Sequence, residues 1–125
     1  MNTLTGKTIL VTGGARRIGR EISLAIARIG GNVIIHHNNS QTEAESTAQE
    51  ITAMGNKATI IQADFSNPSL AIKIFQDKIL SKSTLYGLVN SAAIFQPENF
   101  KDTSLVSWSR HLDINLTMPF LLLLL

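Results

Sequence analysis

A glycine-rich stretch with two adjacent arginines is the part of this sequence best suited to chemistry. The residues TGGARRIGR directly follow an apolar run, and a helix-like pattern follows them. Gly13 and Gly14 permit a tight turn, Gly19 lets the backbone approach a ligand, and the N-terminus of a helix attracts anions. Arg16 and Arg17 add permanent positive charge at the same place. The stretch is therefore interpreted as a phosphate-binding loop, with a plain turn between a strand and a helix as the simpler alternative.

Strands and helices that alternate along the chain must position this loop. Short apolar runs predict strands over residues 7–12, 32–37, 57–63 and 84–90. Helical spacing predicts helices after the glycine loop, after Ser40 (a capping box with Glu43), at Asn67-Pro68, and from Thr103 or Ser104 onward. Such alternation is typical of an α/β fold, a doubly wound parallel sheet with Rossmann-like strand order 3-2-1-4. In that order, loops 13–20 and 90–97 meet where ligands bind.

Composition excludes several other kinds of site. The 125 residues contain no cysteine, which excludes disulfides and thiolate metal sites and suits a cytoplasmic protein. The net charge of +2 is small and dispersed, so no nucleic-acid partner is expected. The apolar end, MPFLLLLL, is far shorter than the roughly 20 residues of a membrane helix. It predicts instead a buried helix cut partway through, so that the chain is expected to be truncated in the helix after the fourth strand.

None of the three histidines is expected to bind a metal ion. His36 and His37 are adjacent on a predicted strand and point to opposite faces, so they cannot chelate one ion together. His37 is interpreted as a solvated strand-end residue. His111 is interpreted as a surface residue paired with Asp113, without a role of its own.

The glycine loop resembles that of the short-chain dehydrogenase/reductase family, whose pattern is T-G-x-x-x-[A/G]-x-G. Thr12, Gly13 and Gly19 match it, and Arg17 replaces the small residue. That replacement resembles the pteridine reductase branch, including dihydromonapterin/dihydrofolate reductase-like members, in which the arginine lies against the phosphates of the cofactor. The resemblance implies a Rossmann domain and an oxidoreductase that uses a nicotinamide cofactor.

The end of the second predicted strand favours NADPH over NADH. An NAD site normally places an acid there, whereas this stretch reads HHNNS and the first acid is Glu43. The stretch is similar to the H-x-H-R-S of pteridine reductases, with Asn39 in place of the arginine. The resemblance implies cofactor contacts by a set of loop residues: Thr12, Gly13, Arg16, Arg17, Ile18, Gly19, His36, Asn38, Asn39, Ser40, Asp64, Phe65, Asn90, Ser91 and Ala92. It implies that Asp64 accepts a hydrogen bond from adenine; the alternative is a turn aspartate before a helix.

Two further residues are interpreted as part of a reaction site. Pro119 cannot donate a hydrogen bond to the Asn115 carbonyl, so a kink with a free carbonyl is expected. The resemblance implies the same, because family members have a catalytic asparagine whose carbonyl positions water in a proton relay. Phe95 falls on the phenylalanine of the pteridine reductase motif N-N-A-S-S-F, which implies stacking on the pterin; simple loop packing is the alternative.

The resemblance covers nearly all of the chain but only about the N-terminal half of a family member. Residues 1–125 are therefore expected to be the first part of a single dinucleotide-binding domain. The family's serine and Tyr-x-x-x-Lys motif have no counterpart in this chain, so the chain by itself is predicted to be inactive. The resemblance implies that the parent protein acts on a small molecule and forms homo-oligomers, either dimers or tetramers. Alternatives are a reductase of carbonyl substrates, such as 3-oxoacyl groups or ketones, and a non-catalytic fragment that binds a nucleotide or a partner.

Overall fold

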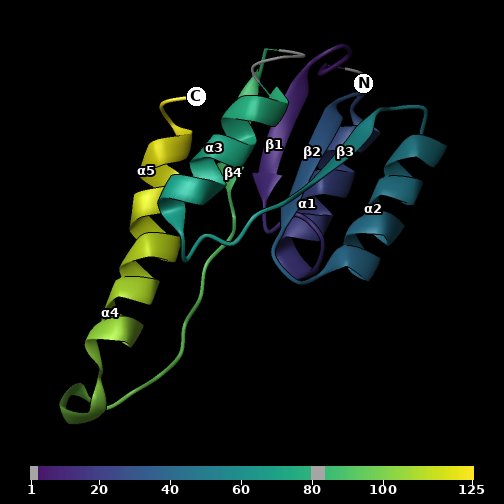
Figure 1. Ribbon diagram of the computed structural model, residues 1–125. Coiled ribbons are helices and arrows are strands. Elements are labelled where there is room, and N and C mark those ends of the chain that lie inside the picture. The colour runs from purple at the N-terminus through teal and green to yellow at the C-terminus, as the bar shows by residue number, and fades with distance from the viewer. Residues whose placement is uncertain (1–2, 80–83) are drawn as a thin grey trace.

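A parallel sheet of four strands forms the centre of the protein (Figure 1). The computed structural model describes residues 3–79 and 84–125. The strands are β1 (Thr8–Thr12), β2 (Asn32–His37), β3 (Ala58–Gln62) and β4 (Gly87–Asn90). They lie in the order β3-β2-β1-β4, and every pairing is parallel. The doubly wound α/β fold and the strand order expected from the sequence are thus confirmed.

Helices α1 (Arg17–Arg28) and α2 (Gln41–Ala53) cover one face of the sheet (Figure 1). Their buried side chains pack on alternate residues of β1 and β2, in one core cluster: Ile9, Val11, Ala15, Leu24, Ala27, Val33, Ile35, Ala44 and Ile51. Each helix is followed by a glycine with positive φ, 91° at Gly30 and 90° at Gly55. Glycine adopts this conformation without a steric penalty, so the chain turns there into the next strand.

The opposite face is covered by α3 (Pro68–Ile79) and by the last helical segment of the chain. Its core cluster combines the other alternate strand residues with buried residues of the loop after β3, of α3 and of the last helical segment: Leu10, Ile34, Ile61, Ala63, Phe65, Ala71, Phe75, Ile79, Ile114, Met118 and Leu122. Successive side chains of a strand point to opposite faces, which is why neighbouring residues such as Ile9 and Leu10 belong to different clusters. Helices on both faces explain why the strands are continuously apolar.

The last helical segment is a rod (Figure 1), and it consists of three parts. These are α4 (Leu105–Leu112), a π-helical turn (Asp113–Thr117) and α5 (Met118–Leu122). At its start, the Ser104 hydroxyl accepts a hydrogen bond from the Ser107 N–H at 3.0 Å, which makes Ser104 the N-cap residue. Neither this rod nor any other helix in residues 3–79 and 84–125 has the length and apolarity needed to cross a membrane.

The π-helical turn is the form that the expected kink takes. The Met118 N–H bonds to the Asp113 carbonyl five residues earlier, instead of the usual four. Pro119 follows directly and has no N–H to offer the Asn115 carbonyl. The turn widens where that hydrogen bond is missing, so sequence and structure agree on the place of the irregularity.

Two details of the sequence prediction are wrong. The fourth strand, expected over residues 84–90, begins only at Gly87. The expected capping box of Ser40 and Glu43 does not form: Ser40 is the N-cap residue of α2, but its side chain accepts no capping hydrogen bond. Its backbone N–H donates instead to Nδ1 of His37, at 3.1 Å. A buried histidine therefore orients the start of this helix.

Candidate functional site

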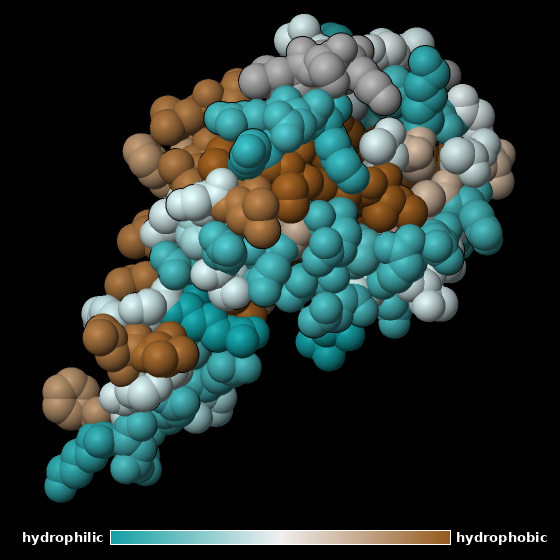
Figure 2. All heavy atoms as spheres, viewed as in Figure 1, coloured by the Kyte–Doolittle hydropathy of each residue, from teal (hydrophilic) through white to brown (hydrophobic). Residues whose placement is uncertain are grey.

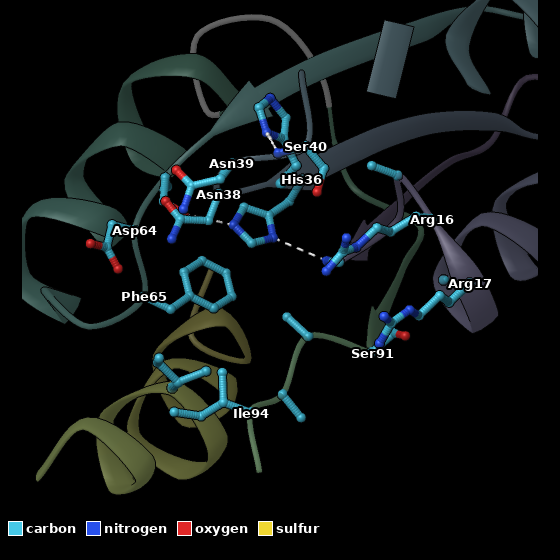
Figure 3. A pocket seen from close by; sticks show the side chains of 18 of the residues that line it. Arg16, Arg17, His36, Asn38, Asn39, Ser40, Asp64, Phe65, Ser91 and Ile94 are labelled. Carbon is cyan, nitrogen blue, oxygen red and sulfur yellow. Dashed lines mark hydrogen bonds between the residues drawn. The ribbon is translucent and has the colours of Figure 1, made fainter. Parts of the chain in front are cut away.

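A cleft of about 500 Å³ opens at the carboxyl ends of the strands (Figure 3). It lies beside β1 and β4, where the order of the strands reverses and where open parallel sheets bind ligands. Five separate parts of the chain line it: Gly13, Ala15, Arg16, Arg17, Ile18 and Gly19; His36, His37, Asn38, Asn39 and Ser40; Ala63, Asp64 and Phe65; Ser91, Ala92, Ala93 and Ile94; Arg110 and Ile114. Most of the residues predicted to bind a cofactor are thus brought together. Thr12 and Asn90 are not among the lining residues.

Two glycines of the loop are required by close backbone packing. Gly13 has a φ of 58°, and a Cβ there would lie 3.0 Å from Cα of Ala92. A Cβ on Gly19 would lie 1.9 Å from the carbonyl oxygen of Gly13, which no real contact permits. The sequence prediction that Gly19 makes room for a ligand is therefore incomplete, because its hydrogen first makes room for the loop itself.

Arg17 occupies a backbone conformation that suits glycine. Its φ is 55°, and among the described residues it is the one non-glycine residue with positive φ. This region costs a side chain roughly 1–2 kcal/mol. The positive φ explains why related loops usually have a small residue at this position. In this chain an arginine occupies the position in spite of the strain. Strain of this kind is typical of functional sites.

Arg16 reaches the cleft from an ordinary extended backbone, with φ −151°. Both arginine side chains are solvent-exposed and lie on the glycine-loop side of the cleft (Figure 3). A third arginine, Arg110, lines the cleft from α4, whereas Asp64 is the only acidic residue in the lining. The cleft therefore favours an anion.

His36 is a buried connector between the glycine loop and β3. Its Nδ1 accepts a hydrogen bond from the Gly13 N–H at 3.1 Å, and its Nε2 donates to the Ala63 carbonyl at 2.9 Å. The ring stacks on Phe65, with 4.0 Å between ring centroids and 4° between planes. Burial lowers the pKa of His36 to about 4, although the Ala63 carbonyl acts in the opposite direction. The neutral ring thus holds the glycine loop in place at the wall of the cleft, which it also lines.

The stability of the fold should fall in mild acid because of His36. In the unfolded chain a histidine has a pKa of about 6.5. The folded state therefore binds fewer protons between that pH and 4, and stability present above about pH 6.5 is lost as the pH falls through 4. At about 1.4 kcal/mol per pH unit, the loss amounts to about 3 kcal/mol. Urea unfolding at a series of pH values measures it.

The matched control for this prediction is His36→Asn, whose side-chain oxygen can still accept from the Gly13 N–H but does not titrate. The variant should lack this part of the pH dependence. An unchanged slope in the variant would show that other groups cause the acid sensitivity.

The end of β2 presents amides and a hydroxyl to the cleft. Asn38, Asn39 and Ser40 line it, and no carboxylate lies among them, as the sequence predicted. The interpretation of His37 as a solvated residue is wrong, because only 3% of it is exposed. Its Nδ1 is occupied by the Ser40 N–H, so the proton lies on Nε2, which is buried and has no partner in the described part of the chain.

Asp64 and Phe65 form the wall at the end of β3. The Asp64 carboxylate accepts from the Ser66 N–H at 2.9 Å and the Ser66 hydroxyl at 2.7 Å. These bonds lower the pKa of Asp64, with a smaller contribution from the charge of Arg110. Asp64 therefore stabilises the turn before α3, which was the alternative interpretation of this residue. The same residue also lines the cleft.

Thr12 acts from behind the cleft rather than in it. Its hydroxyl accepts from the N–H groups of Ser91 and Ala92 at 3.1 and 3.0 Å, and it is 1% exposed. It ties the end of β1 to the loop after β4, where Ser91 and Ala92 line the cleft. Asn90 pairs with Thr12 in the sheet and stays outside the lining.

Asn115 lies beside the loop after β4. Its side chain accepts from the Ile94 N–H and donates to the Ile94 carbonyl, both at 2.8 Å. The sequence pointed only to the backbone carbonyl of Asn115 and contained no signal for this side-chain contact. Phe95, which follows Ile94 in the chain, is 85% exposed and does not line the cleft.

Sequence reasoning also missed Arg110 and Ile114. Both line the cleft from the last helical segment. Their spacing of four residues places them on one helical face, and that periodicity was the available signal. The expected pairing of His111 with Asp113 is not what the structure shows, since Nε2 of His111 accepts from the Gln96 N–H at 3.1 Å. In residues 3–79 and 84–125, no three His, Asp or Glu side chains cluster in a way that could hold a metal ion.

The chain belongs to the short chain dehydrogenase family, whose model matches residues 7–124. Among curated relatives, it is 33% identical over 121 residues to a 3-oxoacyl-[acyl-carrier-protein] reductase of Synechocystis sp.. That match covers 97% of this chain and 49% of the relative. The chain thus spans about half the length of the curated relatives it matches.

Solved structures of the same family have the same fold. A short chain dehydrogenase from Burkholderia cenocepacia, solved in complex with NADP, has a TM-score of 0.89 and 34% identity, over 96% of this chain and 49% of that one. FolM alternative dihydrofolate reductase 1 from Brucella canis, also complexed with NADP, has a TM-score of 0.82 and 35% identity, over 94% and 48%. The family is therefore established for this chain.

Proposed function

We propose that residues 1–125 are the cofactor-binding part of one dinucleotide-binding domain in an NADPH-dependent oxidoreductase. The observation that carries this proposal is the charge of the cleft, which has three arginines and one carboxylate in its lining. NAD sites normally place an acid after the second strand, and this chain has Asn38, Asn39 and Ser40 there. The NADP complexes of the two similar structures support the same choice.

The residues that line the cleft are of the kinds that such a cofactor requires. The backbone of the glycine loop and the N-terminus of α1 face the cleft, and Arg16 and Arg17 oppose phosphate charge there. The small side chains of Ser91 and Ala92 leave room on the opposite side. Bound NADPH would supply the hydride.

The proton that accompanies hydride transfer is a separate requirement. The π-helical turn leaves the Asn115 carbonyl without the Pro119 N–H, so this carbonyl can accept from an ordered water in a proton relay. The single tyrosine, Tyr86, is followed four positions later by Asn90 rather than lysine. We therefore propose that the 125-residue chain by itself binds NADPH but reduces nothing, and NADPH absorbance with a panel of acceptors measures this.

For the substrate we propose a reduced pterin or dihydrofolate. The arginine in the glycine loop and the position of Phe95 support this class, as does the 35% identity to an alternative dihydrofolate reductase. A carbonyl substrate is the second candidate, because the identity to a 3-oxoacyl reductase is nearly as high. A protein that binds NADPH but turns over neither class would favour the non-catalytic alternative.

The replacement Phe95→Ala separates the two substrate classes. In the protein that contains this chain, it should raise the KM for dihydropterin about tenfold, because stacking and burial of an aromatic ring together contribute more than 1 kcal/mol. The Kd for NADPH should stay within twofold, since Phe95 lies outside the lining of the cleft. Steady-state kinetics and fluorescence titration measure the two effects. If KM and Kd change together, Phe95 packs the loop and the pterin proposal loses its support.

We also propose that the protein forms homo-oligomers through the rod of α4 and α5. Large apolar side chains stay exposed along it: Leu105, Val106, Trp108, Leu112, Leu116, Phe120, Leu123 and Leu124. Figure 2 shows this apolar surface at the left of the view. A patch of this kind on a protein surface marks an interface. Sedimentation velocity on the protein tests it, and a monomer at micromolar concentration would contradict it.

A cytoplasmic location stays a prediction from the composition.

A further inference from the structure

The segment after β4 is held by side chains at every second residue. The N–H of Ala92 donates to the Thr12 hydroxyl at 3.0 Å, and the N–H of Ile94 donates to Asn115 Oδ1 at 2.8 Å. The third bond in this series joins the Gln96 N–H to Nε2 of a histidine on α4, at 3.1 Å. Three side chains, one from β1 and two from the rod, thus fix an extended segment that lies outside the sheet.

This alternation decides which side chains face the solvent. Ala92 and Ile94 pack on the core cluster beneath them. Ala93 and Phe95 are exposed, as expected for the other face of an extended segment. The position of Phe95 therefore depends on the two hydrogen bonds that flank it, one at Ile94 and one at Gln96.

The histidine that makes the second flanking bond is His111. Its Nδ1 donates to the Ser107 carbonyl at 2.8 Å, four residues earlier on the same helix. A carbonyl can only accept, so the ring proton lies on Nδ1 and the lone pair on Nε2 faces Gln96. Asn115 stands one helical turn further on, so both tethers come from the same face of the rod.

We propose that His111 is a positioning residue that, together with Asn115, fixes residues 94–96 and so sets the place of Phe95. This inference rests on the proposed function only for the role of Phe95 toward a substrate. The hydrogen bonds themselves require no ligand. His111 does not line the cleft, so it acts through the segment and not on the cofactor.

The protonated nitrogen of the ring is a direct test. His36 and His37 must carry the proton on Nε2, because Nε2 of His36 donates to a carbonyl and Nδ1 of His37 accepts from an N–H. Long-range 1H–15N spectra, recorded while the histidine rings are neutral, should therefore show two rings protonated at Nε2 and one, that of His111, protonated at Nδ1. A ring of His111 protonated at Nε2 would overturn the proposal.

Two isosteric variants form a matched pair. In His111→Gln the side-chain oxygen takes the place of Nε2 and can still accept from Gln96. In His111→Asn the amide takes the place of Nδ1 and can bond only to Ser107. The backbone N–H of Gln96 should exchange with solvent about three- to tenfold faster in His111→Asn than in His111→Gln, because its hydrogen bond to residue 111 is lost only in His111→Asn. The melting temperatures of the two variants should agree.

Equal exchange of Gln96 in the two variants would overturn the tether. If either variant fails to fold, the proton position in the unsubstituted protein still decides. In an active protein, His111→Asn should raise the substrate KM and leave the Kd for NADPH unchanged, whereas His111→Gln should restore the KM. An unchanged KM with faster exchange would refute the role toward Phe95. A complete lack of turnover by the unsubstituted protein would contradict the proposed function instead, and the exchange result would then decide the tether by itself.

Discussion

Replacing Arg17 with glycine should stabilise the fold and at the same time weaken NADPH binding. Glycine accepts the φ of 55° at this position without the strain that a side chain suffers, so the free energy of unfolding should rise by about 1 kcal/mol. The guanidinium is lost from the glycine-loop side of the cleft, where we propose that the cofactor phosphates bind, so the Kd for NADPH should rise about tenfold. Urea unfolding and fluorescence titration of NADPH measure the two effects.

Two further variants separate conformation from charge. Arg17→Ala removes the charge but keeps a side chain at the strained φ, so it should weaken binding equally without stabilising the fold. Arg16→Gly removes a neighbouring charge from an extended backbone, where glycine offers no relief. If Arg17→Gly and Arg17→Ala have the same stability, the left-handed conformation of Arg17 does not hold in solution.

Replacing Gly19 with alanine should be the most damaging single methyl addition in the glycine loop. The new Cβ would lie 1.9 Å from the Gly13 carbonyl oxygen and 2.7 Å from its carbon. Both are backbone atoms, so the loop and the start of α1 must separate. We expect the free energy of unfolding to fall by about 3 kcal/mol, at the upper end of the usual range for overpacking. NADPH binding should fall with it, because the loop changes shape.

Gly87→Ala is the matched control for this change. A Cβ on Gly87, in β4, would meet the Ile9 side chain at 3.5 Å, an ordinary van der Waals distance. Its effect on stability should stay within about 0.5 kcal/mol. Chemical denaturation of the two variants compares them, and a loss of similar size in both would show that the clash at Gly19 is relieved cheaply.

The order of the elements and the place of the cleft were accessible from the residue pattern alone. Apolar runs, glycine stops and the Asn67-Pro68 start are local features, and each has a local physical reason. Parallel strands joined by helices then leave few topologies, so the two loops that border the cleft could be paired without coordinates. Once the end of the second strand was located, the residue types that follow it showed that no acid lies there.

The contacts of individual polar side chains were decided by the tertiary structure. His37 is buried and orients Ser40, Thr12 ties two strand ends together, and the side chain of Asn115 holds Ile94. The His37–Ser40 bond spans only three residues, whereas the bonds of Thr12 and Asn115 join residues far apart in the sequence, up to 80 positions as between Thr12 and Ala92. No local pattern encodes such a partner, because burial and hydrogen-bond geometry exist only once the sheet has brought the loops together. The left-handed backbone of Arg17 belongs here too, since arginine has no local preference for a φ of 55°.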